Sequence, residues 1–564
     1  MDRVVSVQEQ EELEQKRQST NRLDTTIDQP LSRNKRALRR RQFVEAVTYV
    51  SQLSAHNSLY GGRHLGPLAE YLKKPYEPQT GTDSFPHHVD TPGFKQFFYL
   101  YELGPTAPLH ATCFNNVEEF ESSFLNPSVP KVIFMRGLPS PEWLSAIGAK
   151  LHVSSEFFRR HLEFDEGPQR QFVGPTLPSA NRSMARLRLT TIGYAMSGLR
   201  VASSVDAVRR ESASIMDTYR DHLEHRFRCN AGDSIIRELS IHDLDHFTIE
   251  QDITIYISPK KEGWTVLVWL DLGGNLRTPL SRWMEPRPPV LSEYIACLPV
   301  AQSKPGVLPT SPDQQRRARQ FENPERNVHI HQSGSWLPFN YGQSLDHNLM
   351  IKYSFYALHE IFSFVASSEN QFLNMLESKI VSELDALTLV EQKDPTLSNL
   401  LYHQQVLDRH IQRIRENIAF ISRFTPATDH NGPENPTAIY SKEILCDNEH
   451  LLLKAINLAE RCNRGMQVVM NNATIKESRK AIMQAEGIVI LTRLAFFLLP
   501  LNYVTSIFGM NFAQFGQGSL SIWIWLVVSV PVFVMSVVLV RSDVIEFISR
   551  FYRRRISQIY NLLP

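Results

Sequence analysis

Residues 488–508 read IVILTRLAFFLLPLNYVTSIF, and residues 520–540 read LSIWIWLVVSVPVFVMSVVLV. The hydrocarbon core of a bilayer is about 30 Å thick and requires roughly 20 helical residues, so each stretch is long enough to cross it. The second stretch carries no charge, and Trp523 and Trp525 lie at one end, where indole rings favour the lipid headgroups. The sequence therefore predicts a transmembrane hairpin over residues 487–540.

Basic residues flank this hairpin on both outer sides. Lys476, Arg479 and Lys480 precede the first span, and arginines at 541, 550, 553, 554 and 555 follow the second. The connecting segment 511–519 contains neither lysine nor arginine. Because basic residues concentrate on the cytosolic side of membrane proteins, we expect both termini in the cytosol, including a basic tail over residues 541–564. We expect the plasma membrane to be the host membrane.

The tripeptide Gly509-Met510-Asn511 ends the first span, after Pro500 and Phe508. Two C-terminal spans with this tripeptide at the outer end of the first resemble the CorA-type magnesium transporters. The chain looks like a diverged, eukaryotic CorA-like member of that family. The resemblance in motif covers about 100 residues, and over the N-terminal region it is one of layout. It implies that Gly509, Met510 and Asn511 form a selectivity filter and that Mg²⁺ is the transported ion.

The chemistry of Asn511 suits a hydrated cation. Mg²⁺ loses its water shell reluctantly, so a site can hold the hydrated ion through oxygen acceptors. A symmetric ring of carboxamide oxygens from several copies of Asn511 offers such acceptors. Gly509 lets the chain leave the helix, and the negative ends of several helix dipoles would converge at the same mouth. No organic cofactor is expected.

One stripe of the first span is predicted to line the pore. If Asn502 faces the axis, helical spacing places a polar position, an apolar girdle and small residues on one line. The structural alternative is that the apolar residues of this stripe pack against neighbouring helices. The predicted pore-lining residues are Asn502, Leu499, Ala495, Leu491, Ile488 and Ser506.

A two-span subunit cannot enclose a pore alone, so the pore hypothesis requires a homo-oligomer. The resemblance implies a homopentamer, with the bilayer, other copies of the chain and divalent cations as partners. The net charge of +1 indicates no bias toward nucleic acid. Residues 512–519 carry no carboxylate, whereas this loop is commonly acidic in the family. This departure favours the alternative of a non-conducting, membrane-anchored regulatory or scaffolding protein.

The fold class expected for the whole chain is an α+β multidomain membrane protein. Residues 1–41 are polar and basic and predict a disordered tail, residues 42–340 an α/β cytosolic domain, and residues 341–486 helical arms with a stalk. Short β-branched and aromatic runs predict strands at 97–101, 132–135, 253–257 and 266–270. Helices are predicted at 141–151, 155–162, 345–386 and 398–424, and loops at 301–327 and 425–436.

Several groups of polar residues are candidates for metal or catalytic sites. His242, Asp243, Asp245 and His246 lie close in sequence, and further pairs occur at His87-His88 and at His329 with His331. None supplies three or four converging ligands locally, so structural roles are expected. We find no phosphate-binding glycine loop or nucleophile elbow, and we predict no enzyme. The resemblance implies regulatory Mg²⁺ sites, for which the candidate carboxylates are Asp447, Glu449 and Glu460 on the stalk and Glu377, Glu383 and Asp385 on the arm.

Overall fold

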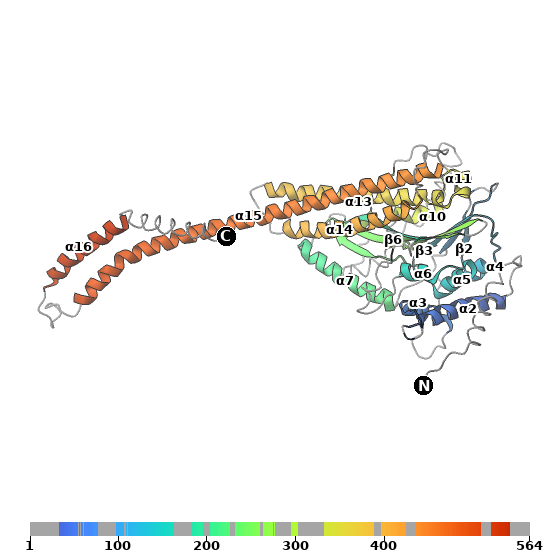
Figure 1. Ribbon diagram of the computed structural model, residues 1–564, viewed down its shortest axis with the longest axis horizontal. Helices are drawn as coiled ribbons and strands as arrows, with labels where there is room; N and C mark the ends of the chain where they lie inside the picture. Colours follow the sequence, from blue (N-terminus) through green and yellow to red (C-terminus); the bar gives the residue numbers. More distant parts are fainter. Residues whose placement is uncertain are drawn as a thin grey trace, which may run out of the picture. The chain divides into compact units, whose positions relative to one another are not determined.

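The computed structural model describes residues 33–54, 56, 58–59, 61–76, 97–105, 109, 111–162, 177, 182–195, 204–225, 232–259, 263–273, 276, 295–302, 332–388, 396–424, 436–508 and 521–541. The chain divides into two compact units, Met1–Gly465 and Met466–Pro564. Helix α15 (Pro436–Phe508) contributes residues to each of them (Figure 1).

The first unit is built on a mixed sheet of eight described strands. Along the sheet the order is β2-β1-β3-β7-β6-β4-β8, and β5 pairs with β6. Only β3 and β7 pair in parallel among the described strands, with Ile133 opposite Leu267, and the other pairs are antiparallel. The bounds are β1 Phe98–Glu102, β2 Ala111–Phe114, β3 Lys131–Arg136, β4 Met184–Ala195, β5 Glu238–Ile241, β6 His246–Pro259, β7 Trp264–Leu270 and β8 Ile295–Cys297.

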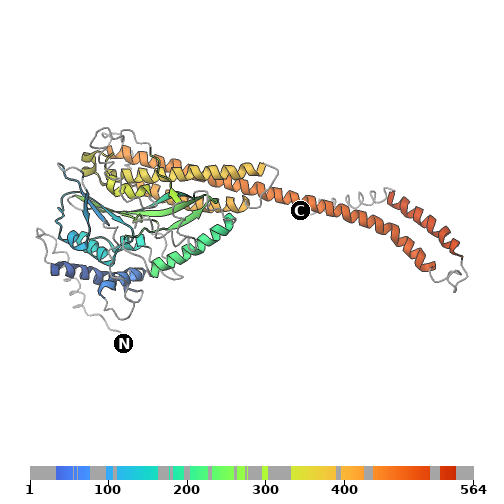
Figure 2. The same ribbon diagram turned by 180° about the vertical axis from the view of Figure 1, so that it is seen from behind.

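Helices cover both faces of this sheet. Side chains alternate between the faces along each strand, so Ile133 and Met135 enter one core and Val132 and Phe134 enter the other. The first face packs against α2, α3, α5 and α6, and the second against α10 to α14, as Figures 1 and 2 show. Every residue of β3 is buried, as expected for a strand with helices on both faces.

The helices of the first face are α2 (Arg33–Ser51), α3 (Gly66–Lys73), α4 (Val117–Ser122), α5 (Pro141–Leu151) and α6 (Ser155–Leu162), with 3₁₀ turns η1 (Arg63–Leu65) and η2 (Lys74–Tyr76); α7 (Val205–His225) packs on β5 and β6. Local sequence sets the bounds of α5. The Ser140 hydroxyl accepts a hydrogen bond from the Trp143 amide at 3.3 Å, and Pro141 occupies the first turn. The helix ends at His152, which has a positive φ of 54°.

The second face is covered by η6 (Ser333–Trp336), α10 (Leu337–Asn340), α11 (His347–Lys352), α12 (Ser354–Ala357), α13 (His359–Thr388), α14 (Thr396–Ile421) and the start of α15. Their apolar residues join those of the sheet in a single core, in which Ile253, Phe362 and Ile444 are at most 2% exposed. The predicted sheet domain and arms therefore share one hydrophobic core and belong to one compact unit.

The structure corrects two sequence-based expectations. The disordered tail was predicted to reach residue 41, but α2 begins at Arg33. Its basic residues favour helix, Arg40 pairs with Glu121 at 3.3 Å, and Phe43 packs so closely on α5 that a Cβ at Gly148 would lie 2.3 Å from its ring. The α/β prediction for this domain is also wrong in part, because the described strands include a single parallel pair among antiparallel ones.

The predicted elements otherwise agree well with the structure. The four predicted strands correspond to β1, β3, β6 and β7, and the bounds of α5 and α6 are confirmed to the residue. The predicted helix at 345–386 is divided into α11, α12 and α13. Most of the predicted loop at 301–327 and nearly all of that at 425–436 lie outside the described residues.

The second unit contains the membrane-proximal part of α15 and the helix α16 (Ile522–Arg541). By length and composition, one described helix, Ala438–Phe508 of α15, includes a stretch long and apolar enough to cross a membrane. Helix α16 is apolar from Ile522 to Val538, and this apolar segment is shorter than 18 residues. The second predicted span therefore remains a proposal.

Candidate functional site

The predicted filter residues Gly509, Met510 and Asn511 lie between α15 and α16, outside the residues that the structure describes. The described part of the candidate site is the C-terminal segment of α15. It holds all six predicted pore-lining positions, from Ile488 to Ser506, on one continuous helix.

These six positions are exposed in the single chain. Ile488, Leu491 and Leu499 are 63%, 66% and 68% exposed, which is unusual for large apolar side chains. Ala495, Asn502 and Ser506 are exposed as well. The stripe is therefore formed by the helix geometry, and nothing within the described chain covers it.

Helix α16 packs on another side of α15. The rings of Phe497 and Phe533 lie 6.1 Å apart, and Val504 of α15 and Ser529 of α16 are 7% and 5% exposed. The six stripe positions and the less exposed positions point to nearly opposite sides of α15. At about 100° per residue, the mean directions of the two sets differ by roughly 165°. Those less exposed positions are Phe497, Pro500, Leu501, Val504 and Phe508.

The polar side chains of this segment differ in how they are satisfied. Thr492 and Thr505 donate to backbone carbonyls one turn earlier, at 2.8 Å each. Asn502 has no hydrogen-bond partner among the described residues. A carboxamide in an apolar helix needs water or another polar group, because leaving it unpaired in hydrocarbon costs several kcal/mol.

The candidate regulatory carboxylates do not form a metal site within the described part of one chain. No group of three or more His, Cys, Asp or Glu residues there is arranged to hold a metal ion. Glu377 of α13 pairs with Lys454 at 3.3 Å and Arg461 at 3.2 Å, both on α15. Glu460 pairs with Arg464 at 3.0 Å, and Asp447 and Glu449 are exposed on α15. Glu383 accepts a hydrogen bond from Asn399 at 2.7 Å.

The histidines near β6 have structural roles. His242 is 3% exposed, and its Nε2 lies 3.0 Å from the Thr248 hydroxyl. Asp243 accepts hydrogen bonds from the backbone of the following turn and pairs with Lys379 of α13, and its Oδ1 lies 3.0 Å from His246 Nδ1. These contacts tie the turn before β6 to an arm helix. His87, His88, His329 and His331 lie outside the described residues.

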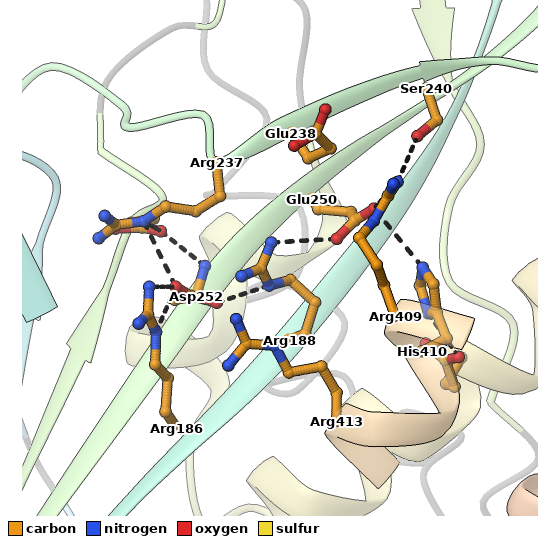
Figure 3. A network of polar contacts seen from close by, with 12 residues as sticks. Arg186, Arg188, Arg237, Glu238, Ser240, Glu250, Asp252, Arg409, His410 and Arg413 are labelled. Carbon is orange, nitrogen blue, oxygen red and sulfur yellow. Dashed lines mark hydrogen bonds and ion pairs between the residues drawn. The ribbon is translucent and has the colours of Figure 1, made fainter. Parts of the chain in front are cut away.

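A buried charge cluster joins β4, β6 and α14, and it was not predicted. We define it as Arg186 and Arg188 of β4, Arg237 immediately before β5, Glu250 and Asp252 of β6, and Arg409, His410 and Arg413 of α14 (Figure 3). Arg188 lies 2.7 Å from Asp252 and 3.0 Å from Glu250. Arg237 makes two contacts with Asp271, at 2.7 and 2.8 Å.

The protonation states within this cluster follow from its charges. Burial alone would raise the pKa of Asp252, but Arg186, Arg188 and Arg237 together hold that pKa well below its ordinary value. Burial alone would lower the pKa of His410, whereas Glu369 and Glu250 raise it to about 9. His410 Nδ1 lies 2.8 Å from Glu369, and His410 Nε2 lies 3.5 Å from Glu250. His410 is therefore charged at neutral pH.

A sequence signal for this cluster does exist. Arg186 and Arg188 alternate with Ala185 and Leu187, and Glu250 and Asp252 show the same spacing in β6. Opposite charges at period two on two strands predict a cross-strand network if the strands pair. The register places Arg188 directly opposite Asp252.

The C-terminal part of the chain matches a known protein family. Residues 335–541 match the family model described as CorA-like Mg2+ transporter protein. Among solved structures, the CorA magnesium transporter from Methanocaldococcus jannaschii is similar at 12% identity, covering 79% of this chain and 98% of that chain, with a TM-score of 0.34. The full-length CmaX protein is similar at 10% identity, covering 79% and 96%, with a TM-score of 0.35. The chain matches none of the curated protein sequences with which it was compared.

Proposed function

Residues 335–541 belong to the CorA-like Mg2+ transporter family, and from this we propose that the protein is a homo-oligomeric channel for hydrated Mg²⁺. In this proposal α15 lines the axis, α16 faces lipid, and a ring of Asn511 carboxamides forms the outer filter. Flow is passive, along the electrochemical gradient, and both termini lie in the cytosol of an integral membrane protein. The ion is cargo, so the chain performs no chemical reaction.

The observation that supports the pore is the stripe on α15. Its members are exposed on the side of the helix that α16 leaves open, and Asn502 within it has no partner among the described residues. Lipid acyl chains can cover Leu491 or Leu499, but they cannot hydrogen-bond to a carboxamide. Copies of the same helix around a water-filled axis would cover the apolar members and hydrate the polar ones.

The oligomer is tested first. The mass of the detergent-solubilised complex, after subtraction of bound detergent, is expected to correspond to several chains, with five as the number that the family resemblance implies. A monomeric mass in detergent and in native-lipid discs would contradict the pore.

The filter is tested by flux. Purified protein in liposomes that enclose a Mg²⁺-sensitive dye is expected to admit Mg²⁺, and Asn511→Ala is expected to lower the rate about ten-fold or more. Gln517→Ala is the matched control, since it removes a carboxamide from the same connecting segment outside the tripeptide. Equal rates for Asn511→Ala and the unaltered protein would refute the assigned filter.

The second candidate is a non-conducting, membrane-anchored regulatory or scaffolding protein of the same family. It is favoured by residues 512–519, which provide no carboxylate to concentrate cations at the outer mouth. An oligomer of the expected mass that admits no Mg²⁺ at any imposed gradient would support this candidate over the channel.

A further inference from the structure

Two buried histidines lie side by side where the arm helix α14 meets the turn between β5 and β6. His242 belongs to this turn and His403 to α14, and their stacked rings have centroids 5.7 Å apart. They are 3% and 1% exposed. Next to them in both elements, the Ile241 amide donates a hydrogen bond of 2.9 Å to the Tyr402 hydroxyl. The two rings are therefore part of the contact that holds α14 against the sheet.

Three of the four ring nitrogens have no hydrogen-bond partner among the described residues. His242 Nε2 lies 3.0 Å from the Thr248 hydroxyl, whereas His242 Nδ1 and both nitrogens of His403 are buried without a partner. A buried polar group without a partner costs free energy, and a buried charge without a partner costs far more. The folded state therefore favours two neutral rings.

Cationic groups from three elements face this pair. Arg209 of α7 lies over the Tyr402 ring, 3.9 Å from its centroid, and donates to the His242 carbonyl at 3.2 Å. Lys379 of α13 acts on His403, and His410 of α14 acts on His242. Each of these positive charges opposes the uptake of a proton by the pair.

The carboxylates near the pair are already engaged with other groups. Asp243 acts on both rings, but it pairs with Lys379 and with His246 at 3.0 Å. Asp206 lies 3.3 Å from Arg209. His410, two turns further along α14, differs from the pair because Glu369 and Glu250 face its two nitrogens. The same side chain is therefore stabilised as a cation at His410 and as a neutral ring at His403.

The direction of the pKa shifts agrees with this geometry. Burial, followed by the charge of Arg209, lowers the pKa of His403 to about 4. Burial, followed by His403 and Arg209, lowers the pKa of His242 well below 6.5. Because the folded pKa lies below the unfolded value, the stability of the neutral pair is fully present above pH 6.5. It is lost as the pH falls toward 4.

We propose that His242 and His403 form a proton-sensitive latch, in which protonation of either ring releases the first turns of α14 from the turn between β5 and β6. A charged ring would be buried in this contact with no carboxylate of the described residues bonded to it. The hydrogen bond from Ile241 to Tyr402 would open with it. The latch lies within the first unit, so it does not depend on conduction by the membrane helices.

The experiment measures amide hydrogen exchange of the full chain in detergent at pH 7.5 and pH 5.0, corrected for the intrinsic exchange rate. Protection of residues 238–246 and 396–406 is expected to fall by at least about 30-fold at pH 5.0. This is the effect of one ring whose pKa returns from about 4 to 6.5 when the contact opens. His403→Phe keeps an aromatic ring and cannot take up a proton, so it should reduce the fall by about that factor. His450→Phe, at an exposed position of α15, is the matched control and should retain the full fall.

A second variant tests the electrostatic cause without altering either histidine. Lys379→Gln leaves Asp243 free to offset a proton on the pair, so the fall between pH 7.5 and pH 5.0 should become smaller. At pH 7.5, His403→Phe is expected to keep or raise protection, because the nitrogens it removes have no partner among the described residues. The proposal is overturned if either variant shows the same fall as the unaltered protein. It is also overturned if His403→Phe lowers protection at pH 7.5, as the loss of a hydrogen bond, direct or through water, would do.

Discussion

The charge on His410 is expected to make the stability of the first unit depend on pH. His410 is 2% exposed between Glu250 and Glu369, which raise its pKa from 6.5 to about 9 despite burial. One pKa unit corresponds to about 1.4 kcal/mol, so the interaction contributes roughly 3 kcal/mol when the imidazole is protonated in the folded state. Because the folded pKa lies above the unfolded value, this stability is fully present below pH 6.5 and is lost as the pH rises through 9.

The assay is urea unfolding of the full chain in detergent, followed by tryptophan fluorescence, at pH 6 and pH 9.5. Trp269 is fully buried in β7 and reports on the sheet. The free energy of unfolding is expected to fall by roughly 3 kcal/mol more in the unaltered protein than in His410→Gln. His450→Gln, a change at an exposed position of α15, is the control and should retain the full pH dependence. Parallel pH profiles for His410→Gln and the unaltered protein would refute the assigned charge state.

Three further substitutions test other contacts by the same unfolding assay. Ile253→Ala empties a fully buried position in the core shared by sheet and arms, and it should lower the free energy of unfolding by about 2–5 kcal/mol. Gly137→Ala should cost about 1–3 kcal/mol, because Gly137 has a φ of 67° and the added Cβ would lie 2.5 Å from the Asp233 carbonyl oxygen. Glu377→Gln breaks half-exposed pairs with Lys454 and Arg461, so it should cost less than about 1 kcal/mol, and less again in high salt.

The sequence predicted best those elements whose limits are set locally. Ser140 and Pro141 define the start of α5, and its bounds were predicted to the residue. The strands β3 and β7 were also found, because helices cover both faces and their sequences are continuously apolar.

The sequence failed where tertiary contacts decide the structure. Strand β4 escaped prediction because Arg186 and Arg188 make one of its faces resemble a solvent-exposed surface, whereas Asp252 and Glu250 pair with them inside the protein. The first nine residues of helix α2 were assigned to the tail because they are mostly basic, whereas Phe43, Val44 and Val47 beyond them pack against α3, α5 and α6. Neither contact can be derived from local periodicity.

In the membrane segment, the apolar and the polar positions of α15 differ in what can surround them. The apolar positions Ile488, Leu491 and Leu499 are compatible with either lipid or neighbouring copies, because lipid chains and apolar side chains cover them equally well. Asn502 is not, because its amide hydrogen-bonds to nothing that the structure describes and the hydrocarbon core of the bilayer offers no donor or acceptor. Asn502 lies on the same stripe as these apolar positions. The polar positions of α15 therefore distinguish a channel from an anchor, whereas its hydrophobicity does not.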